Sequence, residues 1–257
     1  MPLFDTHCHY DDSWFDADRE ALLAALPAQG VELALNPGCN LASSRKAVSY
    51  AETYPHIYAA VGFHPSDAAD YDDEAEEALR LLARHDKVKA IGEIGLDYYW
   101  ADYPSHEVQK AVFRRQLRLA EELGLPVIVH DREAHGDCLA VVKEFPNVRG
   151  VYHCYSGSLE DAKTLISLGW NLSFTGSITY KNAKKAPEVI AWLPEDRFMI
   201  ETDSPYMLPY PREKGEKRND STKVIRVARR IAALRGMEVE EVIRVTTENG
   251  KRFFGIP

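Results

Sequence analysis

The chain has 257 residues, of which 45% are hydrophobic and 28% are charged, a composition typical of a soluble globular protein that can bury a sizeable core. Its formal net charge of -9 argues against a protein that coats nucleic acid through a basic surface. The charge leaves open an enzyme that holds a few phosphates through metal ions and a local basic patch. The apolar runs are far too short to cross a membrane, and Met1-Pro2 leads straight into an apolar segment with no room for a signal peptide.

Apolar segments with the length of strands alternate with helical patterns from one end of the chain to the other. We predict strands over residues 3–7, 31–36, 57–63, 88–93, 126–130, 148–153, 170–174 and 197–202. We predict helices over residues 19–29, 41–53, 72–84, 107–123, 133–145, 159–168, 187–193, 221–234 and 239–253. Most of the strands are apolar throughout, as expected for parallel strands that are buried on both faces.

This alternation predicts an α/β fold, a (β/α)8 TIM barrel that takes up residues 1–257 as a single domain. A doubly wound open sheet is the competing fold. It is disfavoured because no GxGxxG motif follows the first predicted strand.

Two histidines one residue apart, His7 and His9, end the first predicted strand. Because residues i and i+2 of a strand point to the same side, both imidazoles project together, and Asp5 precedes them by two residues. A pair of surface histidines is the alternative interpretation. Five further predicted strands also end in residues of metal-ligand or acid–base type, which are His64, Glu93, His130, His153, Glu201 and Asp203. The carboxyl ends of the strands form the catalytic rim of a TIM barrel, so we expect these side chains to meet there.

Four histidines and two carboxylates of this set can hold two divalent ions, and these residues are His7, His9, Glu93, His130, His153 and Asp203. Glu93 can bridge the ions because one carboxylate offers two oxygens. Two metal ions roughly 3.5–4 Å apart are a common device for hydrolysing phosphate esters, so we expect Glu93 and Asp203 to be catalytic. Imidazole and carboxylate ligands suit Zn²⁺, Mn²⁺ or Ni²⁺, and Mg²⁺ stays open.

Three further assignments have two interpretations each. His64 is either a metal ligand or a catalytic rim residue that hydrogen-bonds the substrate. Glu201 is either a catalytic base or a structural residue. Tyr98, followed by Tyr99 and Trp100, forms either a stacking surface for a substrate base or ordinary loop packing.

The segment after the eighth predicted strand is basic. Residues 212–230 contain eight basic and three acidic residues, a local charge of +5 on a chain of -9. Its position soon after Asp203 makes it a candidate phosphate clamp. The candidate substrate contacts are Arg212, Lys217, Arg218 and Asn219. In the alternative interpretation, Arg218 and Asn219 only pin the loop to the barrel.

Six ordered motifs resemble those of the TatD family of metal-dependent hydrolases over essentially the whole chain. They are Asp5-Thr-His-Cys-His9, Gly62-Phe-His-Pro65, Gly92-Glu-Ile-Gly-Leu-Asp-Tyr98, His130, His153-Cys-Tyr-Ser-Gly157 and Glu201-Thr-Asp-Ser-Pro-Tyr206. The resemblance implies a TIM barrel, two divalent metal ions held by the six ligands named above, and deoxyribonuclease activity, commonly as a 3′→5′ exonuclease on single-stranded DNA. Tyr155 and the pair Asp220-Ser221 depart from the family pattern without removing a ligand.

The alternative function is an amidohydrolase-type enzyme that acts on a small amide, lactone or phosphoester. Many such enzymes have a carbamylated lysine on the fourth strand, where this chain has Glu93, so the nuclease is favoured. We expect single-stranded DNA as the substrate, no membrane partner and a monomer. The four cysteines show no CxxC spacing and no secretory signal precedes them, so we expect reduced thiols in a cytoplasmic protein.

Overall fold

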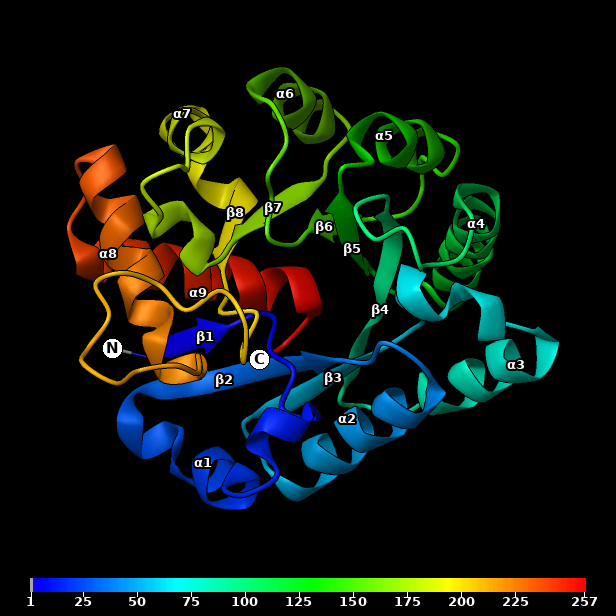
Figure 1. Cartoon of the computed structure of the whole chain (residues 1–257), viewed down its shortest axis with the longest axis horizontal. Helices are drawn as coiled ribbons and strands as arrows, with labels where there is room; N and C mark the ends of the chain where they lie inside the picture. The colour runs from blue at the N-terminus through cyan, green and yellow to red at the C-terminus, as the bar shows by residue number, and fades with distance from the viewer. Residues whose placement is uncertain (1) are drawn as a thin grey trace.

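Eight parallel strands form one sheet in the order β1 to β8 in the computed structural model, which describes residues 2–257. Their bounds are β1 Leu3–Asp5, β2 Val31–Pro37, β3 Ile57–Val61, β4 Val88–Asp97, β5 Val127–Arg132, β6 Gly150–Tyr152, β7 Asn171–Phe174 and β8 Phe198–Ile200. Every neighbouring pair is parallel, with helices between the strands, which confirms the predicted (β/α)8 barrel (Figure 1).

Backbone hydrogen bonds close the barrel between its first and last strands. The N–H of Thr6 donates to the carbonyl of Ile200 at 3.2 Å, and the N–H of Asp203 donates to the carbonyl of His7 at 2.9 Å. The two ends of the barrel sheet therefore meet at this seam. The seam sets His7 beside Asp203, although almost 200 residues separate them in the sequence.

Helices surround the barrel (Figure 1). Their bounds are α1 Arg19–Ala25, α2 Leu41–Thr53, α3 Asp73–Leu82, α4 His106–Leu123, α5 His135–Lys143, α6 Leu159–Ser167, α7 Lys185–Trp192, α8 Val224–Arg235 and α9 Val239–Phe254. Polar side chains fix several of the starts: Asn40, Ser105 and Ser158 accept backbone N–H groups in the first turns of α2, α4 and α6. None of the helices within residues 2–257 is long and apolar enough to cross a membrane.

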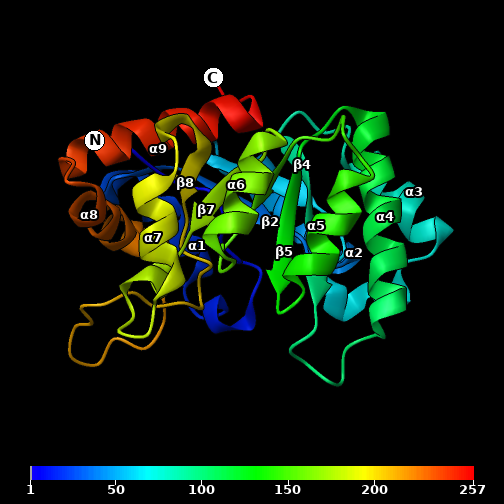
Figure 2. The same cartoon turned by 90° about the horizontal axis from the view of Figure 1, so that it is seen from above.

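The last helix, α9, closes the amino end of the barrel. Phe254 packs against Phe4 of β1 with 6.1 Å between ring centroids, and a Cβ at Gly250 would lie only 2.7 Å from the Phe4 ring. Apolar side chains from the strands fill the interior, so the barrel is a packed core and not a pore. Figure 2 shows α9 across one end and the loops after β4 and β8 at the other, where the polar rim lies.

Some predicted bounds are corrected by the structure. The predicted helix over residues 19–29 ends at Ala25, because Pro27 lacks a backbone N–H and starts a separate 3-10 helix, Pro27–Gln29. The predicted helix over residues 221–234 begins as a 3-10 turn, Ser221–Lys223, before α8. Strand β4 runs four residues beyond its predicted end, as far as Asp97, which it pairs with Arg132 of β5.

Candidate metal centre

The six predicted ligands come together at the carboxyl end of the barrel. Strands β4 and β5 contribute Glu93 and His130, and the other four ligands follow the last residues of β1, β6 and β8. All of them are buried except His130, which is partly exposed. Overlapping groups of three within this set have their nitrogen and oxygen atoms within 4.8 Å of one another.

One half of the centre forms around Oε2 of Glu93. The Nε2 atoms of His7 and His9 lie 3.0 Å apart, and they lie 3.3 and 3.4 Å from this oxygen. Oδ1 of Asp203 completes the group at 3.8 Å from His7 Nε2 and 3.5 Å from His9 Nε2. Two carboxylate oxygens and two imidazole nitrogens therefore face one another.

The other half forms around Oε1 of the same carboxylate. His130 Nδ1 lies 2.8 Å from this oxygen and His153 Nε2 lies 2.7 Å from it, while the two nitrogens are 3.2 Å apart. His64 borders this half, with Nε2 at 4.0 Å from Oε1. The rings of His7 and His153 stack across the two halves at 4.0 Å between centroids.

These distances fit a site for divalent ions. Ligand atoms bound about 2.0–2.1 Å from one ion lie roughly 2.8–3.4 Å apart in octahedral or tetrahedral geometry, close to the spacing in both halves. Within residues 2–257, Glu93 and Asp203 form no ion pair with a lysine or an arginine. Buried carboxylates that lack such partners need another cation, so the donor set fits a metal centre.

The protonation of the two carboxylates also suits ligands. Burial raises the pKa of Glu93, but the charges of His153 and His7 outweigh it, and the pKa lies well below its ordinary value. Burial raises the pKa of Asp203 as well, and a hydrogen bond with His9 together with the charges of the same two histidines brings the pKa below its ordinary value. Both carboxylates are therefore ionised at neutral pH.

Two further carboxylates lie behind the ligand rings, and one of them, Asp97, is not among the site residues predicted from the sequence. Asp97 Oδ2 lies 3.0 Å from Nε2 of His130, on the side of the ring that faces away from Glu93. Glu201 Oε1 lies 3.3 Å from Nδ1 of His153 and accepts the N–H of Cys154 at 2.6 Å. A carboxylate behind a ligand imidazole fixes the ring and increases its basicity. The available signal for Asp97 was its place four residues after Glu93 in the same motif.

Cys39 is a second residue at the centre that is not among those predicted from the sequence. Its Sγ lies 3.9 Å from His9 Nδ1 and 3.9 Å from Glu93 Oε2. Burial raises the pKa of the thiol to about 11, so it stays protonated and serves as a weak hydrogen-bond donor. The sequence signal for it was its position two residues after the end of β2.

His64 has a defined proton position. Burial and the charge of His130 lower its pKa to about 3, so the ring is neutral. Its Nδ1 accepts the backbone N–H of Ser66 at 3.1 Å and lies 2.8 Å from the Ser66 hydroxyl, and a ring nitrogen that accepts a backbone N–H carries no proton. The proton therefore lies on Nε2, which faces the centre.

The aromatic segment after β4 divides into packed and exposed residues. Tyr98 stacks on His106 at 3.5 Å between centroids and donates its hydroxyl to Asp137 at 2.8 Å, which is loop packing. Tyr99 and Trp100 are 49% and 46% exposed. The guanidinium of Arg132 lies over both rings, at 3.9 and 5.5 Å from their centroids.

The structure gives Arg218 and Asn219 the loop-pinning contacts that were the alternative to phosphate binding. Arg218 forms an ion pair with Asp18 at 2.6 Å and donates to the carbonyl of Trp14 at 2.7 Å. Asn219 is fully buried, and its amide donates to the carbonyls of Thr202 and Tyr206 at 2.9 and 2.7 Å.

Lys217 and Arg212 are the two members of the predicted clamp that remain exposed. The guanidinium of Arg212 lies 4.6 Å from the centroid of the Tyr210 ring. Both side chains therefore stay open to a ligand.

Comparisons with known proteins agree with this centre. The sequence profile of the family described as TatD related DNase matches residues 4–255. A Bacillus subtilis relative, described as the uncharacterized metal-dependent hydrolase YabD, is 43% identical over 256 residues, 99% of each chain. A Cronobacter sakazakii relative, named 3'-5' ssDNA/RNA exonuclease TatD, is 34% identical and covers 98% of this chain and 97% of its own. The crystal structure of the TatD homologue YjjV from Escherichia coli superposes with a TM-score of 0.91 at 34% identity, over 99% of this chain and 98% of that one. The chain therefore belongs to the TatD family of metal-dependent hydrolases.

Proposed function

We propose that this hydrolase cleaves phosphodiester bonds of single-stranded DNA with two divalent ions that share the carboxylate of Glu93. The observation that carries the proposal is the division of this carboxylate, whose Oε2 faces one pair of histidines and whose Oε1 faces another. A shared carboxylate between two ions suits the in-line displacement at phosphorus. The Cronobacter relative, by its name a 3'-5' exonuclease on single-stranded DNA and RNA, supports the substrate class and the direction of digestion.

The protein's part is to hold the ligands before substrate arrives. When bound, the ions would polarise the phosphate and lower the pKa of water. Asp97 holds the ring of His130, and Glu201 holds the ring of His153. Glu201 already accepts the N–H of Cys154, so we assign it to positioning and not to proton transfer. Ligands fixed in this way need little reorganisation during the reaction.

Two groups are placed to handle protons and charge. Asp203 is ionised, and its side chain is 13% exposed, so a carboxylate oxygen can accept the proton of the attacking water. His64 presents its Nε2–H beside the His130 half of the centre. That donor can hydrogen-bond a non-bridging oxygen of the phosphate as negative charge develops on it.

The ligand types favour some divalent metals over others. Imidazole together with carboxylate suits Zn²⁺, Mn²⁺ or Ni²⁺, and Mg²⁺ would serve where water completes its coordination. Inductively coupled plasma mass spectrometry of the purified protein identifies the bound metal and tests for two ions per chain. The monomeric state and the cytoplasmic location expected from the sequence stay predictions.

A substitution at Glu93 tests the proposal. Glu93→Gln keeps the size of the side chain, but a neutral amide cannot balance two dications. We expect the bound metal to fall from two ions per chain to one or fewer, and hydrolysis of labelled single-stranded DNA to fall by at least about a hundredfold. Glu32→Gln, on an exposed position of β2, is the matched control. Near-wild-type turnover in Glu93→Gln would show that the carboxylate does not bridge.

The same assay includes the alternative function. A panel of amides, lactones and small phosphoesters is offered to the wild-type protein beside the labelled strand. Turnover of one of these compounds with no hydrolysis of DNA would favour the amidohydrolase-type enzyme. Hydrolysis of DNA that is lost when the metal is removed with a chelator would support the nuclease.

A further inference from the structure

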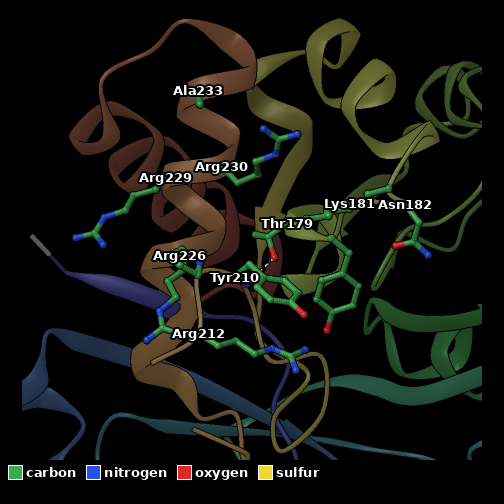
Figure 3. Close-up of a pocket in the computed structure, with 12 residues that line it drawn as sticks. Thr179, Lys181, Asn182, Tyr210, Arg212, Arg226, Arg229, Arg230 and Ala233 are labelled. Carbon is green, nitrogen blue, oxygen red and sulfur yellow. Dashed lines mark hydrogen bonds between the residues drawn. The ribbon is translucent and has the colours of Figure 1, made fainter. Parts of the chain in front are cut away.

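A basic pocket lies beside the loop that follows β8 (Figure 3). Its volume is about 1080 Å³, and its walls come from the turn after β7, the loop after β8 and helix α8. The residues that matter for its chemistry are Tyr180, Lys181, Tyr210, Arg212, Arg229 and Arg230. None of the residues described as lining it is acidic, which is unusual in a chain whose net charge is -9.

Most of the positive charge in the pocket has no counter-charge. Arg226 is neutralised by Glu216, with nitrogen–oxygen distances of 2.7 and 3.0 Å. Lys181 and Arg229 are exposed, and neither forms an ion pair within residues 2–257. Arg230 donates only to a backbone carbonyl, that of Ile178 at 3.3 Å. The pocket therefore attracts anions.

Two tyrosines lie among these cations. The guanidinium of Arg212 lies 4.6 Å from the ring centroid of Tyr210 and 5.9 Å from that of Tyr180. The two rings meet edge to face at 5.8 Å, and Tyr210 is 49% exposed. Aromatic faces beside unpaired cations are the combination that binds the bases and the phosphates of a single strand.

The arrangement of the cations favours a chain of phosphates over one small anion. Arg226, Arg229 and Arg230 occupy one face of α8, whereas Arg212 and Lys181 come from two different loops. In Figure 3 the side chains of Arg212, Arg229 and Arg230 point in different directions and do not converge on one point.

The pocket is tied to the rim that carries the metal centre. The loop after β8 carries Asp203 and reaches Tyr210 seven residues later. The N–H of Tyr210 donates to Oγ1 of Thr179 at 2.8 Å, and the hydroxyl of Tyr180 donates to the carbonyl of Leu208 at 3.2 Å. These bonds fix the tyrosines to the same loop that positions the ligand Asp203.

We propose that this pocket binds nucleotides of a single-stranded nucleic acid a few positions away from the scissile bond. Phosphates contact Lys181, Arg212 and Arg229, and bases stack on Tyr180 and Tyr210. The proposal rests on the proposed function in taking a nucleic acid as the substrate. It differs in that the pocket binds the strand without taking part in its hydrolysis.

Charge reversal in the pocket tests the phosphate contacts. The probe is a fluorescein-labelled oligothymidylate of about ten nucleotides with phosphorothioate linkages, which keep the charge and slow hydrolysis. Fluorescence anisotropy with the metal-loaded protein gives Kd as a function of salt. We expect Kd to rise at least about tenfold in Lys181→Glu/Arg229→Glu, and the slope of log K against log salt to fall by about 0.7 for each phosphate that the variant no longer binds.

The matched control reverses two exposed cations far from the pocket. Lys46→Glu/Arg149→Glu changes the net charge by the same amount, on helix α2 and just before β6. We expect Kd to change by no more than about twofold in this control. An equal rise of Kd in both double variants would reduce the effect to net charge and overturn the proposal.

Tyr210 separates stacking from charge. Tyr210→Ala removes the exposed ring, and we expect Kd for the strand to rise by roughly fivefold or more. Tyr210→Phe keeps the ring and should bind like the wild-type protein. A duplex of the same length should bind more weakly than the single strand, because its bases are not free to stack. If Tyr210→Ala binds the strand as tightly as the wild-type protein, bases do not stack on this ring, and the proposal is overturned.

Failure of this inference differs from failure of the proposed function. If the wild-type protein hydrolyses single-stranded DNA while the pocket variants bind the probe normally, the pocket proposal falls and the nuclease stands. If the variants lose binding and the wild-type protein shows no hydrolysis, the pocket proposal stands and the nuclease falls. Competition by thymidine monophosphate as strong as that by the oligonucleotide would show a site for one small anion and overturn a strand-binding pocket.

Discussion

In each ligand histidine, one ring nitrogen faces Glu93, and the group near the other ring nitrogen differs between the two halves of the metal centre. The rings of His130 and His153 have the carboxylates of Asp97 and Glu201 at their second nitrogens. His7 Nδ1 and His153 Nδ1 are both buried without a hydrogen-bond partner within residues 2–257, although Glu201 Oε1 lies 3.3 Å from the second of them. His9 Nδ1 faces the thiol of Cys39. The half around Glu93 Oε1 therefore has a carboxylate near the second nitrogen of each imidazole, while the other half has one more ligand.

Asp97→Asn tests this division. The amide keeps the size of the side chain but loses the charge that holds His130. We expect the affinity for one of the two ions to fall by about 10–100-fold, since partners of ligand histidines typically contribute that much. Titration calorimetry with the metal-free protein measures both sites.

A matched control for this prediction is Asp137→Asn, which changes the contacts with Tyr98 and with Lys110 and touches no ligand histidine. It should keep both affinities. Equal weakening of both sites in Asp97→Asn would show a general distortion of the rim, and unchanged affinities would show that Asp97 does not support the ligand.

At the level of elements, the loop after β8 shows what the sequence could predict and what it could not. The ends of the strands follow from local apolar patterns, and those patterns predicted the rim residues that the structure brings together. The contacts of Arg218 with Asp18, 200 positions earlier, depend on how the barrel closes. No local pattern contains that information, and the same applies to the burial of Asn219 and to the pocket between β7, β8 and α8.

The ion pair between Arg218 and Asp18 fastens this loop to α1, and a double-mutant cycle measures its strength. The two side chains are 26% and 46% exposed, so we expect a coupling of only about 0.2–1 kcal/mol in the free energy of unfolding. The variants are Asp18→Asn, Arg218→Gln and the combination, compared by chemical denaturation.

The pH dependence of this coupling has a defined sign. A hydrogen bond from Arg218 lowers the pKa of Asp18 below its ordinary value of 3.8. The stabilisation is therefore present above that pH and is lost only as the pH falls through the lower, folded-state pKa. The coupling should be the same at pH 5 and pH 8 and should weaken with salt. A coupling that vanished between pH 5 and pH 8 would mean that another group titrates.

For the whole molecule, the metal centre connects parts of the chain that are distant in sequence. Its ligands follow or lie on β1, β4, β5, β6 and β8, so bound ions cross-link most of the circumference of the barrel. Two of the ligands, Glu93 and Asp203, are ionised and buried carboxylates. Their oxygens lie 3.3 and 3.8 Å from the same atom, His7 Nε2. In the folded state these charges repel each other unless cations or protonated histidines lie between them.

Removal of the metal should therefore destabilise the entire fold. A ligand that binds only the folded state at about 1,000 times its Kd adds roughly 4 kcal/mol, and for a domain of this size each kcal/mol shifts Tm by about 2–4 °C. We expect a chelator to lower the Tm of the wild-type protein by about 8–16 °C, and added metal to restore it. Glu93→Gln should show a much smaller shift, because fewer ions bind to it. A Tm that is the same with and without chelator would show that the stability of the fold does not depend on bound metal. That result would contradict the proposal that two ions bind the folded protein.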